Sequence, residues 1–326
     1  MSDDADRLCT ALLTSLCSRR CALRLVLYGL GAGALVRCAP PLEPDVPPQL
    51  SRRRGLQATD ATFFVAADTH LGAAGMAAAN RRQVEAMNAL PGTRWPARSA
   101  GRVAVPRGVI VLGDLTESGS FDQWRQFVAL YGHTGTEGLL RFPVWLCTGN
   151  HDRSMLAAHG VLDQVRLRHG ALRYGFALDD VRFLCLDQYP GERGRRWLAR
   201  QLERVGPEAP VVLFFHYPLS GMLAGGWRPE DKEQLALTIV RFNVLAIFHG
   251  HFHKSERYRW QRHDVYNPGS PKHRWHSFLA VRITDQHMIV ASWDWDRRSW
   301  AWFHYQPLRP TEAGRGASVR AIRPAS

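Results

Sequence analysis

Five short apolar segments of the chain are each followed by residues of the kinds that bind metals. The segments cover residues 62–67, 109–112, 142–147, 211–215 and 244–248, and their length and hydrophobicity predict buried β-strands. The residues that follow them are Asp68 and His70, Asp114, Asn150 and His151, His216, and His251 and His253. Because ligands of open α/β sheets bind at the carboxyl ends of the strands, we expect these side chains to face one site.

The chemistry of this residue set indicates a metal centre. Carboxylate oxygens, an amide oxygen and imidazole nitrogens without thiolates suit divalent ions such as Mn, Fe or Zn, and argue against a cysteine-rich structural zinc site. Side chains at positions i and i+2 of an extended strand point to the same side. The pairs Asp68/His70 and His251/His253 could therefore each address one metal, provided that the extended backbone persists past the strand.

Each motif also has a simpler interpretation when it is taken alone. Gly149-Asn150-His151-Asp152 fits a turn with a capping aspartate. A single histidine is most simply a surface residue or a satisfied core residue. The recurrence at five successive strand ends favours a common site, since chance would rarely place these groups in this order.

The composition indicates a globular protein with an excess of positive charge. Of 326 residues, 45% are hydrophobic and 11 are tryptophan, which is enough for a sizeable core. The net charge of +13 suits a phosphate-bearing or otherwise anionic partner, although a GC-rich genome produces the same excess of arginine. The sequence has no zinc-finger spacing, RNA-binding signature or basic heptad region, which disfavours nucleic acid as the partner. The six cysteines lack CxxC spacing, so neither a zinc knuckle nor a disulfide framework is expected.

Predicted helices alternate with the predicted strands. Apolar residues recur at helical spacing in 77–90, 121–131, 194–205 and 229–242. A hairpin is predicted around Asp179-Asp180, and residues 255–305 have the pattern of short strands with alternating, sheet-packing tryptophans. This alternation predicts an α/β fold.

The two ends of the chain differ from the predicted domain, which we place at residues 59–306. Residues 1–39 contain a pair of arginines, Arg19-Arg20, followed by an uncharged stretch at 25–36, and this arrangement resembles a twin-arginine export signal. It predicts the twin-arginine export machinery as a partner and an exported, periplasmic or membrane-associated location. An uncleaved anchor or a disordered tail are the alternatives, with a cytoplasmic location if nothing is exported. Residues 40–58 are predicted to form a linker and residues 307–326 a disordered tail.

The motif series resembles that of the calcineurin-like metallophosphoesterases. Over about residues 62–270, the family's motifs are matched in order by Asp68-x-His70, Gly113-Asp114, Gly149-Asn150-His151-Asp152, His216 and Gly250-His251-x-His253. The resemblance implies a four-layer α/β/β/α sandwich with two mixed sheets and a dinuclear metal centre. It implies one metal held by Asp68, His70, Asp114 and His253, and another held by Asp114, Asn150, His216 and His251, with Asp114 as the bridge.

Phosphoester hydrolysis is the reaction that the resemblance implies, with a metal-activated hydroxide attacking phosphorus. His151 corresponds to the family's non-ligand histidine, which stabilises the phosphoryl group or protonates the leaving oxygen, and Asp152 is expected to orient it. Arg153 and Tyr217 are candidate substrate contacts. The segments 91–106 and 219–228 are expected to wall the pocket.

The expected substrate is a small-molecule or lipid-headgroup phosphate in an exported compartment. Two other functions remain open on the sequence alone. One is a cytoplasmic phosphodiesterase for cyclic nucleotides or nucleic acid, and the other is a non-catalytic metal-binding interaction module that has kept the fold. The complete ligand set argues against the module, because proteins that lose catalysis usually lose ligands.

Overall fold

A computed structural model of the chain describes residues 59–97, 100–153, 160–221, 223–308 and 320–321. The predicted export signal and linker, at 1–39 and 40–58, lie outside these residues, as does most of the predicted tail. In this described part of the chain, none of the helices combines the length and apolarity that crossing a bilayer requires.

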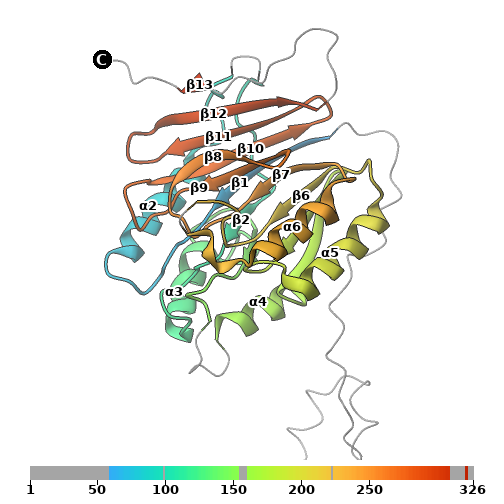
Figure 1. The fold of residues 1–326 in the computed structure, drawn as a ribbon. Helices are drawn as coiled ribbons and strands as arrows, with labels where there is room; N and C mark the ends of the chain where they lie inside the picture. Colours follow the sequence, from blue (N-terminus) through green and yellow to red (C-terminus); the bar gives the residue numbers. More distant parts are fainter. Residues whose placement is uncertain (1–58, 98–99, 154–159, 222, 309–319, 322–326) are drawn as a thin grey trace, which may run out of the picture. The chain divides into compact units, whose positions relative to one another are not determined.

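The first of two mixed β-sheets has the strand order β13-β12-β11-β10-β1-β2-β3 (Figure 1). In this sheet β1, β2 and β3 are parallel, and the remaining neighbours are antiparallel. The strands are β1 (Asp60–Ala66), β2 (Val109–Leu112), β3 (Val144–Cys147), β10 (Ser277–Thr284), β11 (His287–Asp294), β12 (Ser299–Pro307) and β13 (Arg320–Ala321).

The second sheet has the strand order β4-β5-β6-β7-β9-β8. Its central strands β5, β6, β7 and β9 are parallel, whereas β4 and β8 pair antiparallel at the two edges. The strands are β4 (Arg173–Leu178), β5 (Val181–Leu186), β6 (Val211–Phe214), β7 (Val244–Phe248), β8 (Ser255–Trp260) and β9 (His263–Pro268). The hairpin predicted around Asp179-Asp180 is the β4–β5 pair.

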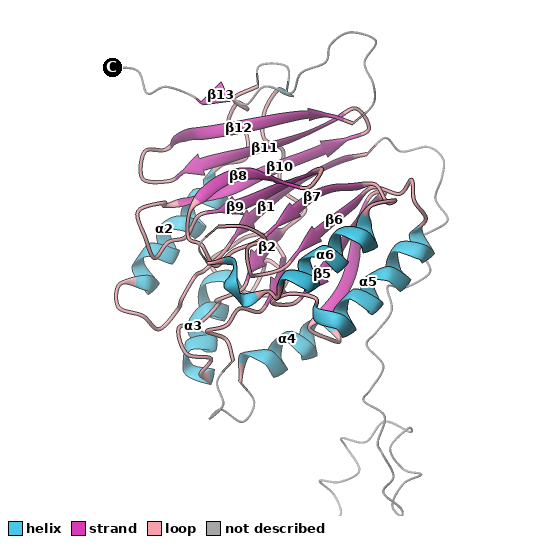
Figure 2. Ribbon diagram, in the orientation of Figure 1, coloured by secondary structure: helices cyan, strands magenta, loops and turns pink. Residues whose placement is uncertain are grey.

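Helices cover the outer face of each sheet (Figure 2). The first sheet packs against α2 (Met76–Ala89), α3 (Phe121–Tyr131) and α4 (Val161–His169). The second packs against α5 (Gly191–Val205) and α6 (Pro229–Ile239), and a short 3-10 helix, η3 (Ala224–Gly226), precedes α6. A third apolar cluster fills the space between the two sheets. The predicted four-layer α/β/β/α sandwich is therefore confirmed.

The central strand β1 shows why the predicted strands read as continuous apolar runs. Its Phe63 and Val65 face the layer between the sheets, while Phe64 and Ala66 face the helices, because successive side chains of a strand point to opposite faces. A strand covered on both faces must be apolar at every position. All five strands predicted from such runs are present, as β1, β2, β3, β6 and β7.

Phe63→Ala is expected to lower the free energy of unfolding by about 3–5 kcal/mol, because it leaves a cavity between the sheets. The ring is fully buried and meets Phe183 edge-on at 5.0 Å and Phe248 at 6.2 Å. Urea unfolding followed by fluorescence measures the change. Phe121→Ala, at a ring that is 48% exposed on α3, is the matched control and should cost far less. Equal losses in both variants would contradict this description of the core.

The polar segment 91–106 lies on the first sheet rather than at the predicted site. Trp95 stacks on Trp300 of β12 at 5.6 Å, and the carbonyl of Ala100 accepts a hydrogen bond from Arg282 at 2.9 Å. Arg282 pairs with Thr62 near the start of β1, whereas the candidate ligands follow the end of that strand. The expectation that this segment walls the pocket is not supported by its position.

Candidate metal centre

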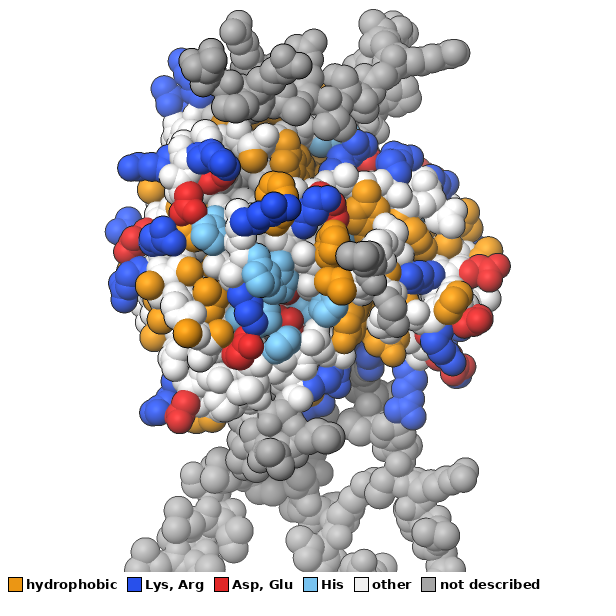
Figure 3. Space-filling model, turned by 60° about the vertical axis from the view of Figure 1, so that its left-hand side comes forward, with side chains coloured by type: hydrophobic (Ala, Val, Ile, Leu, Met, Phe, Trp, Pro, Cys, Tyr) orange, Lys and Arg blue, Asp and Glu red, His pale blue; other side chains and the backbone are white. Residues whose placement is uncertain are grey.

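The candidate ligands meet at the carboxyl ends of strands from both sheets. Their ligand atoms form two groups, and within each group they lie within 4.8 Å of one another. The first group is Asp68, His70, Asp114 and His253, and the second contains Asp114, His216 and His251. On the surface of the protein, histidine side chains gather in a patch beside Lys or Arg and Asp or Glu side chains (Figure 3).

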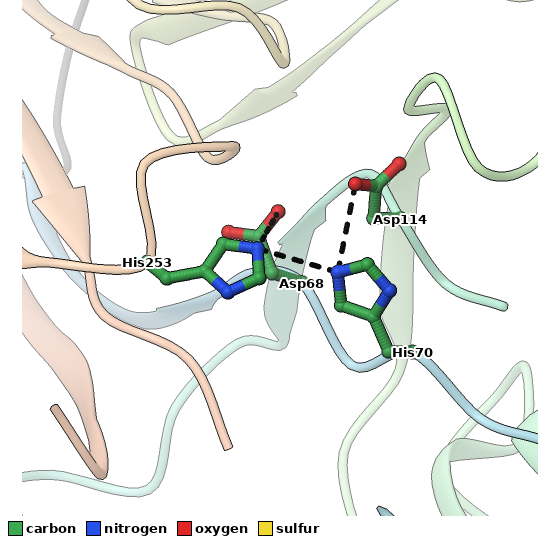
Figure 4. Close-up of side chains that lie close together, drawn as sticks. All are labelled: Asp68, His70, Asp114 and His253. Carbon is green, nitrogen blue, oxygen red and sulfur yellow. Dashed lines mark hydrogen bonds and ion pairs between the residues drawn. The ribbon is translucent and has the colours of Figure 1, made fainter. Parts of the chain in front are cut away.

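The first group has the spacing of atoms that share one ion (Figure 4). His70 Nε2 lies 3.3 Å from His253 Nε2 and 3.6 Å from Asp114 Oδ2, and His253 Nε2 lies 3.6 Å from Asp68 Oδ1. Ligand atoms about 2.1 Å from a common ion stand roughly 3.0–3.4 Å apart. The group therefore fits a divalent cation with only small adjustments.

The second group is arranged around His216. Its Nε2 lies 3.4 Å from Asp114 Oδ2, 3.1 Å from Asn150 Oδ1 and 3.2 Å from His251 Nδ1. The amide oxygen of Asn150 thus joins this group, as the sequence predicted. Asp114 Oδ2 lies close to a histidine of each group, so one carboxylate is placed between two candidate ion positions.

Hydrogen bonds outside the two groups fix which ring nitrogen faces the site. The Nδ1 atom of His70 is 2.7 Å from Glu117 Oε2, and the Nδ1 atom of His216 is 2.8 Å from the Leu112 carbonyl oxygen. In both residues an acceptor holds the outer nitrogen, which leaves Nε2 as the ligand atom. Metal-binding histidines in proteins are commonly oriented in this way.

Left-handed backbone conformations occur at five of the candidate ligands. The φ angles are 55° at Asp68, 45° at His70, 47° at Asp114, 68° at His251 and 53° at His253. Few non-glycine residues adopt this region, and such strain gathers at functional sites. The backbone is not extended here, so the i and i+2 rule fails for one pair. His251 joins the second group and His253 the first, while Asp68 and His70 do share a group.

The glycines before Asn150 and His251 permit a close approach of backbone to ligand. A Cβ atom on Gly149 would lie 2.1 Å from Asp114 Oδ1, and one on Gly250 would lie 2.8 Å from the Leu112 carbonyl oxygen. Neither distance is possible for a real side chain. These two motif positions therefore require glycine for a steric reason.

Burial sets the charge state of the site. It lowers the pKa of His70 and His251 to about 4 and that of His253 to about 3, so these imidazoles are neutral at pH 7, the form that binds metals. Burial alone would lower the pKa of His216 too, but the Asp114 carboxylate beside it raises that pKa to about 9. Burial raises the pKa of Asp68 well above its ordinary value. A cation among these groups would relieve the burial cost of the carboxylates.

His151 belongs to neither of these two groups, although its ring and Glu117 form a third group of potential ligand atoms with His70. Its backbone N–H donates to Asp114 Oδ1 at 2.8 Å, and its Nδ1 is 2.8 Å from the Glu117 carbonyl oxygen. The ring meets His70 edge-on at 4.7 Å. Because Nδ1 is held by a carbonyl, it carries a proton, and Nε2 is the atom available to a substrate.

Asp152 does not orient His151, which is a difference from the role expected for it. Its carboxylate accepts hydrogen bonds from the backbone N–H groups of Leu115, Thr116 and Gly149, at 2.8–3.1 Å, and from the Thr116 hydroxyl. These bonds join the loop after β2 to the loop after β3. Asp152 therefore positions the backbone that carries Asp114 and Asn150.

The two candidate substrate contacts lie on the side of the second group. The ring of Tyr217 meets His251 at 4.7 Å, and Arg153, which is 42% exposed, donates to Asp187 Oδ2 at 2.8 Å. Trp227, from the segment 219–228, packs against Tyr189 at 5.4 Å and donates its Nε1–H to the Tyr217 carbonyl. The segment 219–228 therefore contacts Tyr217 through the side chain of Trp227.

Glu117 and Asp187 were given no role from the sequence, although a signal was present for each. Glu117 lies three residues after Asp114, in the loop that follows β2. Its side chain contacts His70 Nδ1, and its carbonyl oxygen contacts His151 Nδ1. Asp187 follows the apolar strand β5, as the candidate ligands follow theirs. A search that considered every carboxylate after a predicted strand would have identified both residues.

Comparisons with known proteins also indicate a phosphoesterase. The sequence model described as calcineurin-like phosphoesterase matches residues 61–255. A probable glycerophosphodiester phosphodiesterase, GpdQ, from Arcobacter nitrofigilis is 26% identical over 184 residues, which are 52% of this chain and 64% of that protein. The match thus spans less than two thirds of the relative's length.

Solved structures share the fold at low sequence identity. A dimetal phosphatase from Danio rerio superposes with a TM-score of 0.52 and 15% identity, covering 71% of this chain and 95% of that one. GAP50, the anchor in the inner membrane complex of Plasmodium, superposes with a TM-score of 0.57 and 11% identity, covering 78% and 90%. At these sequence identities, the two similarities show a shared fold only.

Proposed function

Since the chain belongs to the calcineurin-like phosphoesterase family, a family of phosphoric ester hydrolases, we propose that it hydrolyses a small-molecule or lipid-headgroup phosphoester at a dinuclear metal centre. The observation that carries this proposal is the position of Asp114. Its Oδ2 atom lies 3.6 Å from His70 Nε2 and 3.4 Å from His216 Nε2, so a single carboxylate serves both groups of ligands.

The residues would hold two ions as the motifs predicted. Asp68, His70, Asp114 and His253 would bind one, and Asp114, Asn150, His216 and His251 the other. Two divalent ions, Mn, Fe or Zn, supply Lewis acidity and lower the pKa of water when bound at such a site. The mixture of oxygen and imidazole ligands suits these ions.

His151 is proposed as the proton donor to the leaving oxygen. The Glu117 carbonyl fixes its Nδ1–H, so a protonated ring directs its Nε2–H away from that carbonyl. As the bond between phosphorus and the leaving oxygen breaks, the proton on Nε2 passes to that oxygen, and the neutral ring remains. Proton transfer from a positioned histidine contributes about 10²–10⁴-fold to a rate.

A phosphodiester is the favoured substrate within this class. The relative from Arcobacter nitrofigilis, which matches 52% of this chain, carries the name of a probable glycerophosphodiester phosphodiesterase. Glycerophosphodiesters combine a small alcohol with a lipid headgroup, which agrees with the substrate class expected from the sequence.

Hydrolysis of bis-p-nitrophenyl phosphate and p-nitrophenyl phosphate by the full chain tests the proposal. We expect turnover with Mn, loss of turnover when EDTA removes the metal, recovery on adding Mn back, and preference for the diester. A protein that binds Mn but cleaves neither ester would favour a non-catalytic metal-binding module.

We further propose an exported location, which rests on residues 1–39 alone. A fusion of a folded reporter to these residues is expected to leave the cytoplasm. When lysine replaces both Arg19 and Arg20, the fusion is expected to stay in the cytoplasm. Retention of the unsubstituted fusion would favour the cytoplasmic alternative.

Glu117→Gln is expected to weaken metal binding about tenfold, because partners behind a metal-binding histidine tune its orientation and basicity. Glu117 Oε2 lies 2.7 Å from His70 Nδ1 and 2.8 Å from Lys272 Nζ. Titrating Mn into the metal-free protein and following turnover measures the shift. Glu85→Gln, at an exposed position of α2, is the control and should match the wild type. An unchanged Mn dependence in Glu117→Gln would show that this carboxylate is dispensable.

A further inference from the structure

A cavity of about 370 Å³ lies beside the candidate metal centre. It is formed between the loop after β5 and the start of α5, with Arg153 on its wall. Its lining includes Gln188, Tyr189 and Arg193. None of these three residues belongs to the ligand set.

The cavity shares a wall with the metal centre. The carbonyl of Gln188 accepts hydrogen bonds from the backbone N–H groups of His216 at 3.1 Å and Tyr217 at 2.9 Å. The Tyr217 ring contacts Tyr189 of the cavity lining at 6.0 Å and His251 of the second ligand group at 4.7 Å. The cavity is therefore one residue away from the metal centre.

A buried hydrogen-bond donor in the lining lacks an acceptor. Gln188 is only 9% exposed, and its Nε2 has no hydrogen-bond partner among the described residues. Leaving such a buried group unsatisfied is costly. Because the surrounding protein encloses this Nε2 atom, the donor adds positive potential to the lining without contacting the cavity directly.

The start of α5 adds further donors on the same side. The first bond within the helix joins the Gly194 N–H to the Pro190 carbonyl, and no side chain caps this end. The N–H groups of residues 191–193 consequently have no acceptor within the helix, and the helix dipole favours negative charge there.

The carboxylates of the lining are already engaged. Asp187 accepts from Arg153 at 2.8 Å and from the Thr148 hydroxyl, and Glu192 pairs with Arg196. Arg193, in contrast, makes no ion pair with any residue in the described part of the chain. Donors and positive charge therefore exceed acceptors in this cavity.

Given the proposed function, on which this assignment rests, we propose that the cavity binds a second anionic group of the substrate, a carboxylate or a phosphate. The ester cleaved at the metal centre then carries this group on its alcohol. Arg193 would contact the anion directly, and the first turn of α5 would donate its backbone N–H groups to it.

Two matched pairs of substrates test the assignment. Glycerophosphoserine differs from glycerophosphoethanolamine by one carboxylate, and glycerophosphoinositol 4-phosphate differs from glycerophosphoinositol by one phosphate. In the Mn-loaded full chain, we expect kcat/KM to be higher for the anionic member of at least one pair, and the pair with the larger ratio identifies the anion. Equal values within both pairs would overturn the assignment.

Variants place this preference in the cavity. Arg193→Gln is expected to lower the ratio of anionic to matched kcat/KM about tenfold, mainly through KM, because a hydrogen bond to a charged group is lost. Arg200→Gln, at an exposed position of the same helix outside the lining, should keep the wild-type ratio. A ratio that survives in Arg193→Gln would overturn the assignment.

Calorimetric binding of the same substrates separates the two proposals. If the protein binds the anionic member more tightly, and Arg193→Gln removes that difference, the cavity assignment holds even where no ester is cleaved. Absence of hydrolysis would then count against the proposed function alone. Equal affinities within both pairs would count against the cavity, whatever the turnover.

Discussion

Asp114→Asn is expected to lower the turnover of bis-p-nitrophenyl phosphate about a thousandfold, since the several kcal/mol that metals contribute convert at 1.36 kcal/mol per factor of ten. The substitution keeps the shape of the side chain but removes the charge that lies between His70 and His216. It also places a neutral amide where the two proposed ions would share a carboxylate. We therefore expect metal content, measured by mass spectrometry, to fall below that of the wild type.

The control for this variant is Asp122→Asn, which removes the same charge from a side chain that is 79% exposed on α3. It should retain both metal and turnover. Circular dichroism and the unfolding midpoint of Asp114→Asn establish that the fold remains. Wild-type turnover in a folded Asp114→Asn protein would refute the dinuclear mechanism, and a loss of turnover with full metal content would refute the bridging role.

His151→Ala is expected to lower kcat by about 10²–10⁴-fold, the usual contribution of a positioned proton donor. The His151 ring is not a ligand of either proposed ion. Its backbone N–H contacts Asp114, and its Nδ1 contacts the Glu117 carbonyl oxygen. Metal content should therefore stay at the wild-type level, which distinguishes this variant from Asp114→Asn. Steady-state kinetics together with metal analysis make the comparison.

The leaving group provides a sharper test of His151. A nitrophenolate leaves without help from an acid, whereas the alkoxide of a glycerophosphodiester requires a proton. His151→Ala should consequently lose much more activity on glycerophosphoethanolamine than on bis-p-nitrophenyl phosphate. The control is His276→Ala, at a residue paired with Asp296 and stacked on Trp295. Equal losses of His151→Ala on the two esters would assign the residue to phosphoryl stabilisation instead.

The positions of the candidate ligands could be predicted from the sequence because they depend on local features. Apolar runs covered on both faces identify strands, and the carboxyl ends of parallel strands share one edge of a sheet. Asp68, Asp114 and His216 each follow such a run, and the structure brings their side chains together. The alternation of strands with amphipathic helices predicted the α/β class, and the family resemblance implied the four layers.

The family resemblance implied the division of the ligands between two groups, but the spacing of the residues did not, because the division depends on the backbone geometry of the loops. His251 and His253 are two residues apart, yet left-handed φ angles at both turn their rings toward different groups. Asp152 follows His151 in the chain, but the backbone N–H groups of two loops surround its carboxylate. The first outcome depends on the backbone of the loop after β7, and the second on how the loops after β2 and β3 pack together.

The cavity beside the centre could be found only in three dimensions. Arg153, Gln188 and Arg193 come from three separate places in the chain and carry no common motif. Whether a glutamine amide is satisfied depends on its neighbours in the fold, and its side chain type does not reveal this. The sequence by itself determined the fold class and the metal-binding residue types, because periodicity and residue chemistry are local. Tertiary structure decided how those residues are shared between two positions, and which unsatisfied donors lie beside them, because both depend on contacts between distant segments.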